Sequence, residues 1–259
     1  MPEFFEPVFG SVSHTALATV AGLVLLAGFI RGFVGFGAAL IIVMVLSVVF
    51  GPVAAVPAAN LAGLPATFQL LPSAIRHGER SFVVPFGLAS FLFAPIGVLV
   101  LVSLDPAIIR MTISVFVLAM LVLLYRGWRL SRHPGAITLA GTGATAGFVQ
   151  GATSASGPLA VVLALSRSGT AVQQRANVIG AVTSLNICAM VPFWYQGLFT
   201  REVLIISLVI MPLYSFAIWV GARFFTERGQ RHFRNAALLT LAVIGAATLA
   251  LAVRDYLAG

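Results

Sequence analysis

The sequence predicts an all-α integral membrane protein made of two inverted repeats, each with one broken or re-entrant helical segment and three transmembrane helices. Three observations support this prediction: an apolar composition, a glycine-rich interruption that occurs twice, and an uneven distribution of arginine. Of the 259 residues, 60% are hydrophobic and 8% are charged, whereas soluble globular domains average about 25% charged residues. The mean hydropathy of +1.06 therefore places the chain in a bilayer.

A glycine-rich motif occurs in both halves of the chain. Residues 28–40 (GFIRGFVGFGAAL) align without gaps with residues 147–159 (GFVQGATSASGPL), at an offset of 119 residues. Self-similarity at a fixed offset indicates an internal duplication. In this alignment Gln150 corresponds to the arginine of the first motif, and Ser154 and Ser156 stand where the first motif has glycines.

The first motif interrupts an apolar segment, Thr15–Phe50, whose 36 residues contain one charge, Arg31. A straight helix of that length would measure about 54 Å, which exceeds the ~30 Å hydrocarbon core of a bilayer. The segment must therefore break, and we expect Gly135–Ser166 to break at the second motif. The arms on either side suit half-helices or re-entrant hairpins. Breaks at matching positions of two halves point to the binding site of a transporter.

The remaining apolar segments are long enough to cross a membrane directly. They predict six plain spans, roughly at Val53–Ile75, Phe82–Val102, Ala107–Tyr125, Ala176–Tyr195, Val203–Phe224 and Ala236–Val253. A short arginine-rich linker, Arg126–Pro134, separates the halves, so residues 1–259 are expected to form one transmembrane domain. Repeat 1 covers about residues 15–125 and repeat 2 about residues 135–253.

The arginines decide between two topologies, because cytoplasmic loops carry an excess of positive residues. If each interrupted segment crosses once, the two faces receive seven arginines each, Arg31 excluded. If each returns to its own side, one face holds eleven arginines and the other holds three, Arg110, Arg201 and Arg254. The second topology has the expected bias. It leaves three full spans per half, so the second half is inverted and both termini lie outside.

Several function classes lack support in the sequence. All fifteen basic residues are arginines, and apart from Arg31 they are scattered at the ends of apolar segments. They form no basic stripe interleaved with aromatics, so nucleic acid is not an expected partner. Cys188 is the single cysteine, and the four histidines lie at segment ends without a metal-ligand pair. No paired carboxylates or nucleophile triad are present, so we expect no enzyme, no catalytic residues, no metal and no cofactor.

Arg31 is the first candidate for binding chemistry. It lies near the middle of its apolar segment, where a charge costs about 2.5–3.5 kcal/mol on insertion scales and usually faces a cavity or a partner. The acidic residues of the chain all lie at segment ends, so the counter-charge could come from an anionic substrate. The alternative is that Arg31 sits on a hairpin tip and binds a lipid headgroup or backbone carbonyls.

The glycines and serines of the motifs are the second candidates. Glycine permits positive φ and close backbone approach, and the N-terminus of a helix binds anions through its backbone N–H groups. We expect second half-helices to begin at Ala38 and Pro158, with Ser154 or Ser156 as N-caps. The alternative is that small residues merely allow helices to pack closely. The motif residues placed in the site are Gly32, Gly35, Gly37, Gln150, Gly151, Ser154 and Ser156.

A polar stripe follows each motif. Asn60 and Thr67 match Asn177 and Ser184 at an offset of 117 residues, and positions seven apart share one helical face. These four residues are expected to line the site, whereas Gln69 and Asn186 point roughly away from Asn60 and Asn177 on their helices. The alternative is that the stripes are hydrogen-bonding contacts between helices, worth about 0.6 kcal/mol each.

The order and duplication of these motifs resemble the TauE/SafE family of sulfite exporter-like permeases. The first motif leads into Ala58–Gly63 and the second into Arg175–Gly180, and the likeness extends from about Thr15 to Leu251. The resemblance implies a multi-pass carrier in the bacterial inner membrane for a sulfur-containing anion such as sulfite, thiosulfate, sulfoacetate or another organosulfonate. Its partners would be the small anion and the bilayer, with a homodimer as an alternative to a monomer. The alternative functions are a channel-like anion pore or a non-transporting membrane scaffold.

Overall fold

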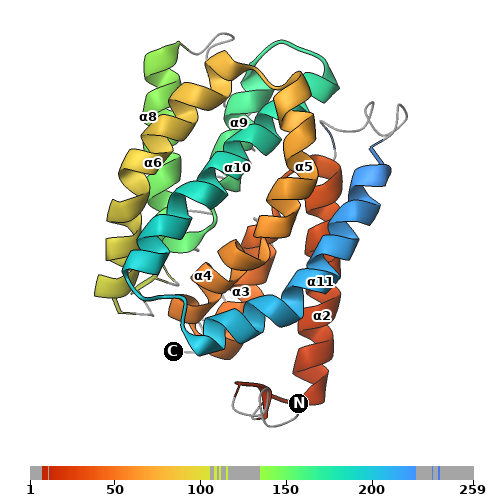
Figure 1. Cartoon of the computed structure of the whole chain (residues 1–259), viewed down its shortest axis with the longest axis vertical. Coiled ribbons are helices and arrows are strands. Elements are labelled where there is room, and N and C mark those ends of the chain that lie inside the picture. Colours follow the sequence, from red (N-terminus) through yellow and green to blue (C-terminus); the bar gives the residue numbers. More distant parts are fainter. Residues whose placement is uncertain are drawn as a thin grey trace.

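The computed structural model describes residues 8–105 except residue 11, residues 135–225, and residues 108, 109, 111, 115, 235 and 239. The regular structure of these residues is helical throughout, which confirms the all-α prediction. Figure 1 shows the helices as one bundle. They are α2 (His14–Val34), α3 (Ala38–Phe50), α4 (Pro52–Ala62), α5 (Leu64–His77), α6 (Arg80–Ser103), α8 (Ala136–Thr153), α9 (Gly157–Ser166), α10 (Ala171–Tyr195) and α11 (Arg201–Arg223).

Four of the described helices, α2, α6, α10 and α11, are long and apolar enough to cross a membrane. The pair α4 and α5 forms a fifth candidate span with a bend of 44°. Large apolar side chains on the outside, such as Leu92 and Trp194, are more than 70% exposed, as expected for a surface that faces lipid. The predicted spans Ala107–Tyr125 and Ala236–Val253 lie almost wholly outside the described residues, and so does the linker Arg126–Pro134.

Both predicted interruptions are breaks between helices. In the first half, α2 ends at Gly35 with φ 98° and α3 begins after Gly37 with φ 94°. Both angles lie in the left-handed region that glycine adopts without a steric penalty. In the second half, α8 ends at Ser154, which has φ 52°, and α9 begins at Gly157. A serine therefore occupies a left-handed position at the second break.

The two broken pairs open toward opposite ends of the molecule. In Figure 1, α2 begins and α3 ends toward the lower end, whereas α8 begins and α9 ends at the upper end. This agrees with hairpins that enter from opposite faces. The inverted relation between the full repeats stays a prediction, since each repeat contains a segment outside the described residues.

The first helix of each half packs against a helix of the other half, α2 against α11 and α8 against α6. Glycines make this contact possible. A Cβ on Gly147 would lie 2.3 Å from the carbonyl oxygen of Ser90, and one on Gly32 would lie 2.2 Å from that of Ile218. These distances leave no room for a methyl group, so the two halves interlock through backbone contacts.

Candidate functional site

A small cavity lies where the two breaks meet. The breaks are in direct contact, because a Cβ on Gly157 would lie 3.6 Å from the Cβ of Phe36. The cavity walls come from the α2–α3 break, the α8–α9 break and the middle of α10. Its lining residues are Arg31, Phe36, Gly37, Ala39, Leu40, Gln150, Ser154, Ala155, Gly157, Val182, Leu185 and Asn186.

The cavity leaves about 20 Å³ for the centre of a water molecule, which is room for about one water. An oxyanion with four or more heavy atoms needs more space than this. Binding of such an anion would therefore require the surrounding groups to move apart.

Arg31 supplies the charge of the cavity. Its side chain is 3% exposed, and its Nη1 donates a hydrogen bond to the Tyr214 hydroxyl at 3.2 Å. The guanidinium carbon lies 6.0 Å from the Tyr214 ring centroid, while the Nε is buried without a hydrogen-bond partner. Within the described part of the chain, no acidic residue belongs to the cavity lining. This burial favours the cavity over the lipid surface as the location of the charge.

At the second break, the position that corresponds to Arg31 holds the neutral amide of Gln150. Gln150 lines the cavity, and its Oε1 accepts a hydrogen bond of 2.6 Å from the Ser156 hydroxyl. Ser156 occupies the N-cap position of α9, but its side chain makes no capping bond. Ser154 instead caps the C-terminus of α8 and donates to the carbonyl of Val56 at 3.2 Å.

The first turns of α3 and α9 both reach the cavity. Gly37, Ala39 and Leu40 of the first break and Gly157 of the second are lining residues, and neither helix has a side-chain N-cap. An uncapped N-terminus leaves backbone N–H groups available and carries a partial positive charge. The cavity thus combines two helix N-termini with one guanidinium, and all three favour an anion.

The first polar stripe reaches this site, and the second does not. The Asn60 amide donates to the Ser154 hydroxyl at 3.5 Å. The Thr67 hydroxyl accepts from Asn186 at 3.3 Å, and Asn186 itself lines the cavity. Ser184 donates to the carbonyl of Gly180 on its own helix.

The two stripes differ because α4 and α5 are bent at Gly63, whereas α10 is one continuous helix. Residues with the same spacing in the two stripes therefore point in different directions relative to the cavity. Asn186, expected to point away from Asn177 and not placed in the site, lines the cavity, whereas Asn177 does not. At the motif offset of 119 residues, Asn186 corresponds to Thr67, which is its hydrogen-bond partner.

The candidate residues fall into three groups in the structure. Four of them line the cavity: Arg31, Gly37, Gln150 and Ser154. Three bond to lining residues: Asn60, Thr67 and Ser156. Five lie elsewhere, namely the glycines Gly32, Gly35 and Gly151 at helix contacts, Ser184 beside Gly87 of α6, and Asn177 in a separate polar cluster.

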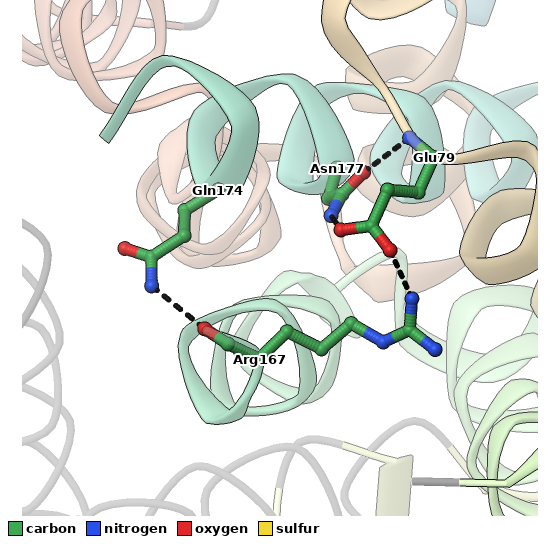
Figure 2. Close-up of polar contacts among 4 residues, drawn as sticks. All are labelled: Glu79, Arg167, Gln174 and Asn177. Carbon is green, nitrogen blue, oxygen red and sulfur yellow. Dashed lines mark hydrogen bonds and ion pairs between the residues drawn. The ribbon is translucent and has the colours of Figure 1, made fainter. Parts of the chain in front are cut away.

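That polar cluster joins three helices at the upper end of the molecule. Figure 2 shows the Glu79 carboxylate between Arg167 and Asn177. Arg167, at the end of α9, forms an ion pair with Glu79, at the start of α6. Asn177 of α10 donates to the same carboxylate at 3.0 Å and accepts from the Glu79 backbone N–H at 2.7 Å. Gln174 donates to the Arg167 carbonyl at 2.9 Å. The cluster therefore holds the C-terminal end of α9, where the second hairpin ends, against α6 and α10.

Arg175 is a buried arginine with a structural role. It donates to the carbonyls of Gly32 and Phe33 in the last turn of α2, and its guanidinium carbon lies 4.2 Å from the Phe225 ring centroid. These carbonyls lack helical partners, so Arg175 caps the helix that carries Arg31. Because Arg175 is buried inside the fold, it is not one of the arginines that mark the cytoplasmic face.

The comparisons with known proteins give one match. The family described as sulfite exporter TauE/SafE matches residues 20–248, a range that contains both breaks and the cavity between them. Neither the curated proteins nor the solved structures gave a match.

Proposed function

Because this chain belongs to the sulfite exporter TauE/SafE family, a family of membrane transporters for sulfur-containing anions, we propose that it carries sulfite or a small organosulfonate across the bacterial inner membrane. Thiosulfate and sulfoacetate are further candidates. The cavity between the two breaks is the proposed binding site.

The observation that carries this proposal is the buried Arg31 guanidinium. It lines the cavity, and none of the acidic residues that the structure describes lines it, so among these residues the buried positive charge has no ionic partner. A buried charge is costly unless it is paired, and two uncapped helix N-termini add to the positive potential. An anion that enters the cavity would complete this site.

Substrate counterflow in liposomes tests the proposal. Purified protein is reconstituted in vesicles loaded with unlabelled sulfite, and uptake of labelled sulfite is measured. A carrier gives faster uptake with internal sulfite than without it, and Arg31→Gln should abolish that stimulation. Arg80→Gln is the matched control, because Arg80 is an exposed arginine at the start of α6.

The same experiment separates the alternative functions. A channel-like pore would give flux that internal substrate does not accelerate, and a scaffold would give neither flux nor binding. Flux without stimulation in wild-type protein would contradict the proposal.

A further inference from the structure

We infer that the cavity accepts a singly charged anion, so that sulfite binds as hydrogensulfite and dianions are rejected. This inference rests on the proposed function and makes it more specific. It ranks hydrogensulfite and monosulfonates above sulfate, thiosulfate and sulfoacetate, which carry two charges near neutral pH.

The charge of the site is the first argument. Arg31 is the charged residue of the cavity lining, and a guanidinium keeps its single positive charge at any physiological pH. A monoanion therefore pairs with the one full charge of the site. A dianion would depend on the partial charges of the two helix N-termini for its second negative charge, in a low-dielectric interior where an incompletely paired ion is disfavoured.

The helices packed around Arg31 do not change this balance. On α11 the facing group is Tyr214, which accepts a hydrogen bond from Arg31. On α10, Arg175 is a second buried cation, but it is bonded to two carbonyls of α2 and does not line the cavity. The thiol of Cys188 on the same helix bonds to the Leu185 carbonyl. The helices α3, α4 and α8 contain no ionisable side chain. Among the described residues, Arg31 is therefore the one cation that lines the cavity.

The hydrogen-bonding groups beside the cavity provide the second argument. A protonated oxyanion brings a donor as well as acceptors. The Asn60 Oδ1 is a buried acceptor without a partner, and the amide of Asn60 contacts the cavity-lining Ser154. The Nε of Arg31 is a buried donor without a partner. A sulfite dianion, a sulfate or a monosulfonate offers acceptors alone and leaves the amide oxygen unsatisfied, so monosulfonates should bind more weakly than hydrogensulfite while keeping the favourable single charge.

The small size of the cavity also favours hydrogensulfite. With room for about one water, the site requires the least expansion for the smallest anion. Hydrogensulfite has one sulfur and three oxygens, whereas sulfoacetate adds a carboxymethyl group and a second charge. Transport of hydrogensulfite also moves one proton with each sulfite, so coupling to pH requires no titrating carboxylate of the protein.

The test compares the pH dependence of binding for two anions. Purified full-length protein in detergent is titrated with sulfite in oxygen-free buffer and with methanesulfonate, which is a monoanion at every pH used. The apparent affinity for total sulfite should fall by roughly tenfold for each pH unit above the pKa of hydrogensulfite, in proportion to the binding-competent fraction. The affinity for methanesulfonate should stay constant, and sulfate should bind at least about tenfold more weakly than methanesulfonate.

Each outcome decides the inference. Constant sulfite affinity into the alkaline range would overturn it, because the dianion would then bind as well. A parallel loss of both affinities would also overturn it, because a protein group would then be titrating. If neither anion binds wild-type protein at any pH, the proposed function fails and the inference fails with it. The Arg31→Gln variant should lose both affinities, while Arg80→Gln should keep both.

Discussion

Arg31 is the residue on which the proposed function depends most directly. Replacing it with glutamine, which imitates Gln150 of the other half, removes the charge and should weaken anion binding by about 2–5 kcal/mol, the usual cost of truncating a buried charge partner. Arg31→Lys keeps the charge but loses the planar fork, so partial affinity is expected. Affinity is measured on protein that stays monodisperse in detergent. Wild-type affinity in Arg31→Gln would end the substrate-pairing hypothesis.

Ser154 tests the geometry of the second break. Its φ of 52° costs a residue with a side chain about 1–2 kcal/mol, while its hydroxyl bonds to the carbonyl of Val56. Ser154→Gly should be close to neutral, because the lost hydrogen bond is offset by the released strain. Ser154→Ala keeps the strain and loses the bond, so it should be less stable by about 1 kcal/mol. Thermal unfolding in detergent compares the two, and equal midpoints would contradict this account.

At the scale of helices, the contact between α8 and α6 depends on glycine. Gly147→Ala places a methyl group 2.3 Å from a backbone oxygen, so it should destabilise the protein by about 1–3 kcal/mol, as overpacking does. Gly141→Ala on the same helix meets nothing within 4 Å and should be neutral or stabilising by up to about 1 kcal/mol. Denaturation midpoints measure both variants. Equal losses would mean that the close packing of α8 on α6 does not limit stability.

The polar cluster around Glu79 makes a second prediction about helices. Glu79→Gln removes the ion pair with Arg167 and should cost about 1.5–3 kcal/mol, the range for hydrogen bonds to charged groups. Glu202→Gln is the control, since Glu202 is an exposed acid in the first turn of α11. The midpoint of thermal unfolding should fall more for Glu79→Gln.

The same variant separates stability from transport. Anion affinity should be unchanged in Glu79→Gln, because this cluster contributes no residue to the cavity lining. The pH dependence of flux in liposomes should persist as well. Loss of that dependence would show that Glu79, a carboxylate of the protein, carries the coupling proton.

At the scale of the whole molecule, the sequence predicted the features that depend on local residue patterns. The breaks follow from segment length and from Gly35 and Gly37, and the gapless repeat predicted that Arg31 and Gln150 occupy equivalent positions. Tertiary contacts decided the rest. The bend at Gly63 has no counterpart in α10, so the second stripe turns away, and the contact of Arg175 with the end of α2 links residues 142 and 143 positions apart. No local pattern of residues encodes such contacts.

The topology is the last prediction, and the arginine distribution decides its direction. The loop after α9 lies at the end of the molecule where Glu79 and Arg167 meet, and the turn after α10 lies at the other end (Figure 1). The positive-inside rule assigns the first end to the cytoplasm. In a Cys188→Ser background, Ser168→Cys should react with a membrane-impermeant maleimide only after cells are permeabilised, whereas Gln196→Cys should react in intact spheroplasts. The reverse pattern would place the mouth of the second hairpin outside and overturn the arginine argument.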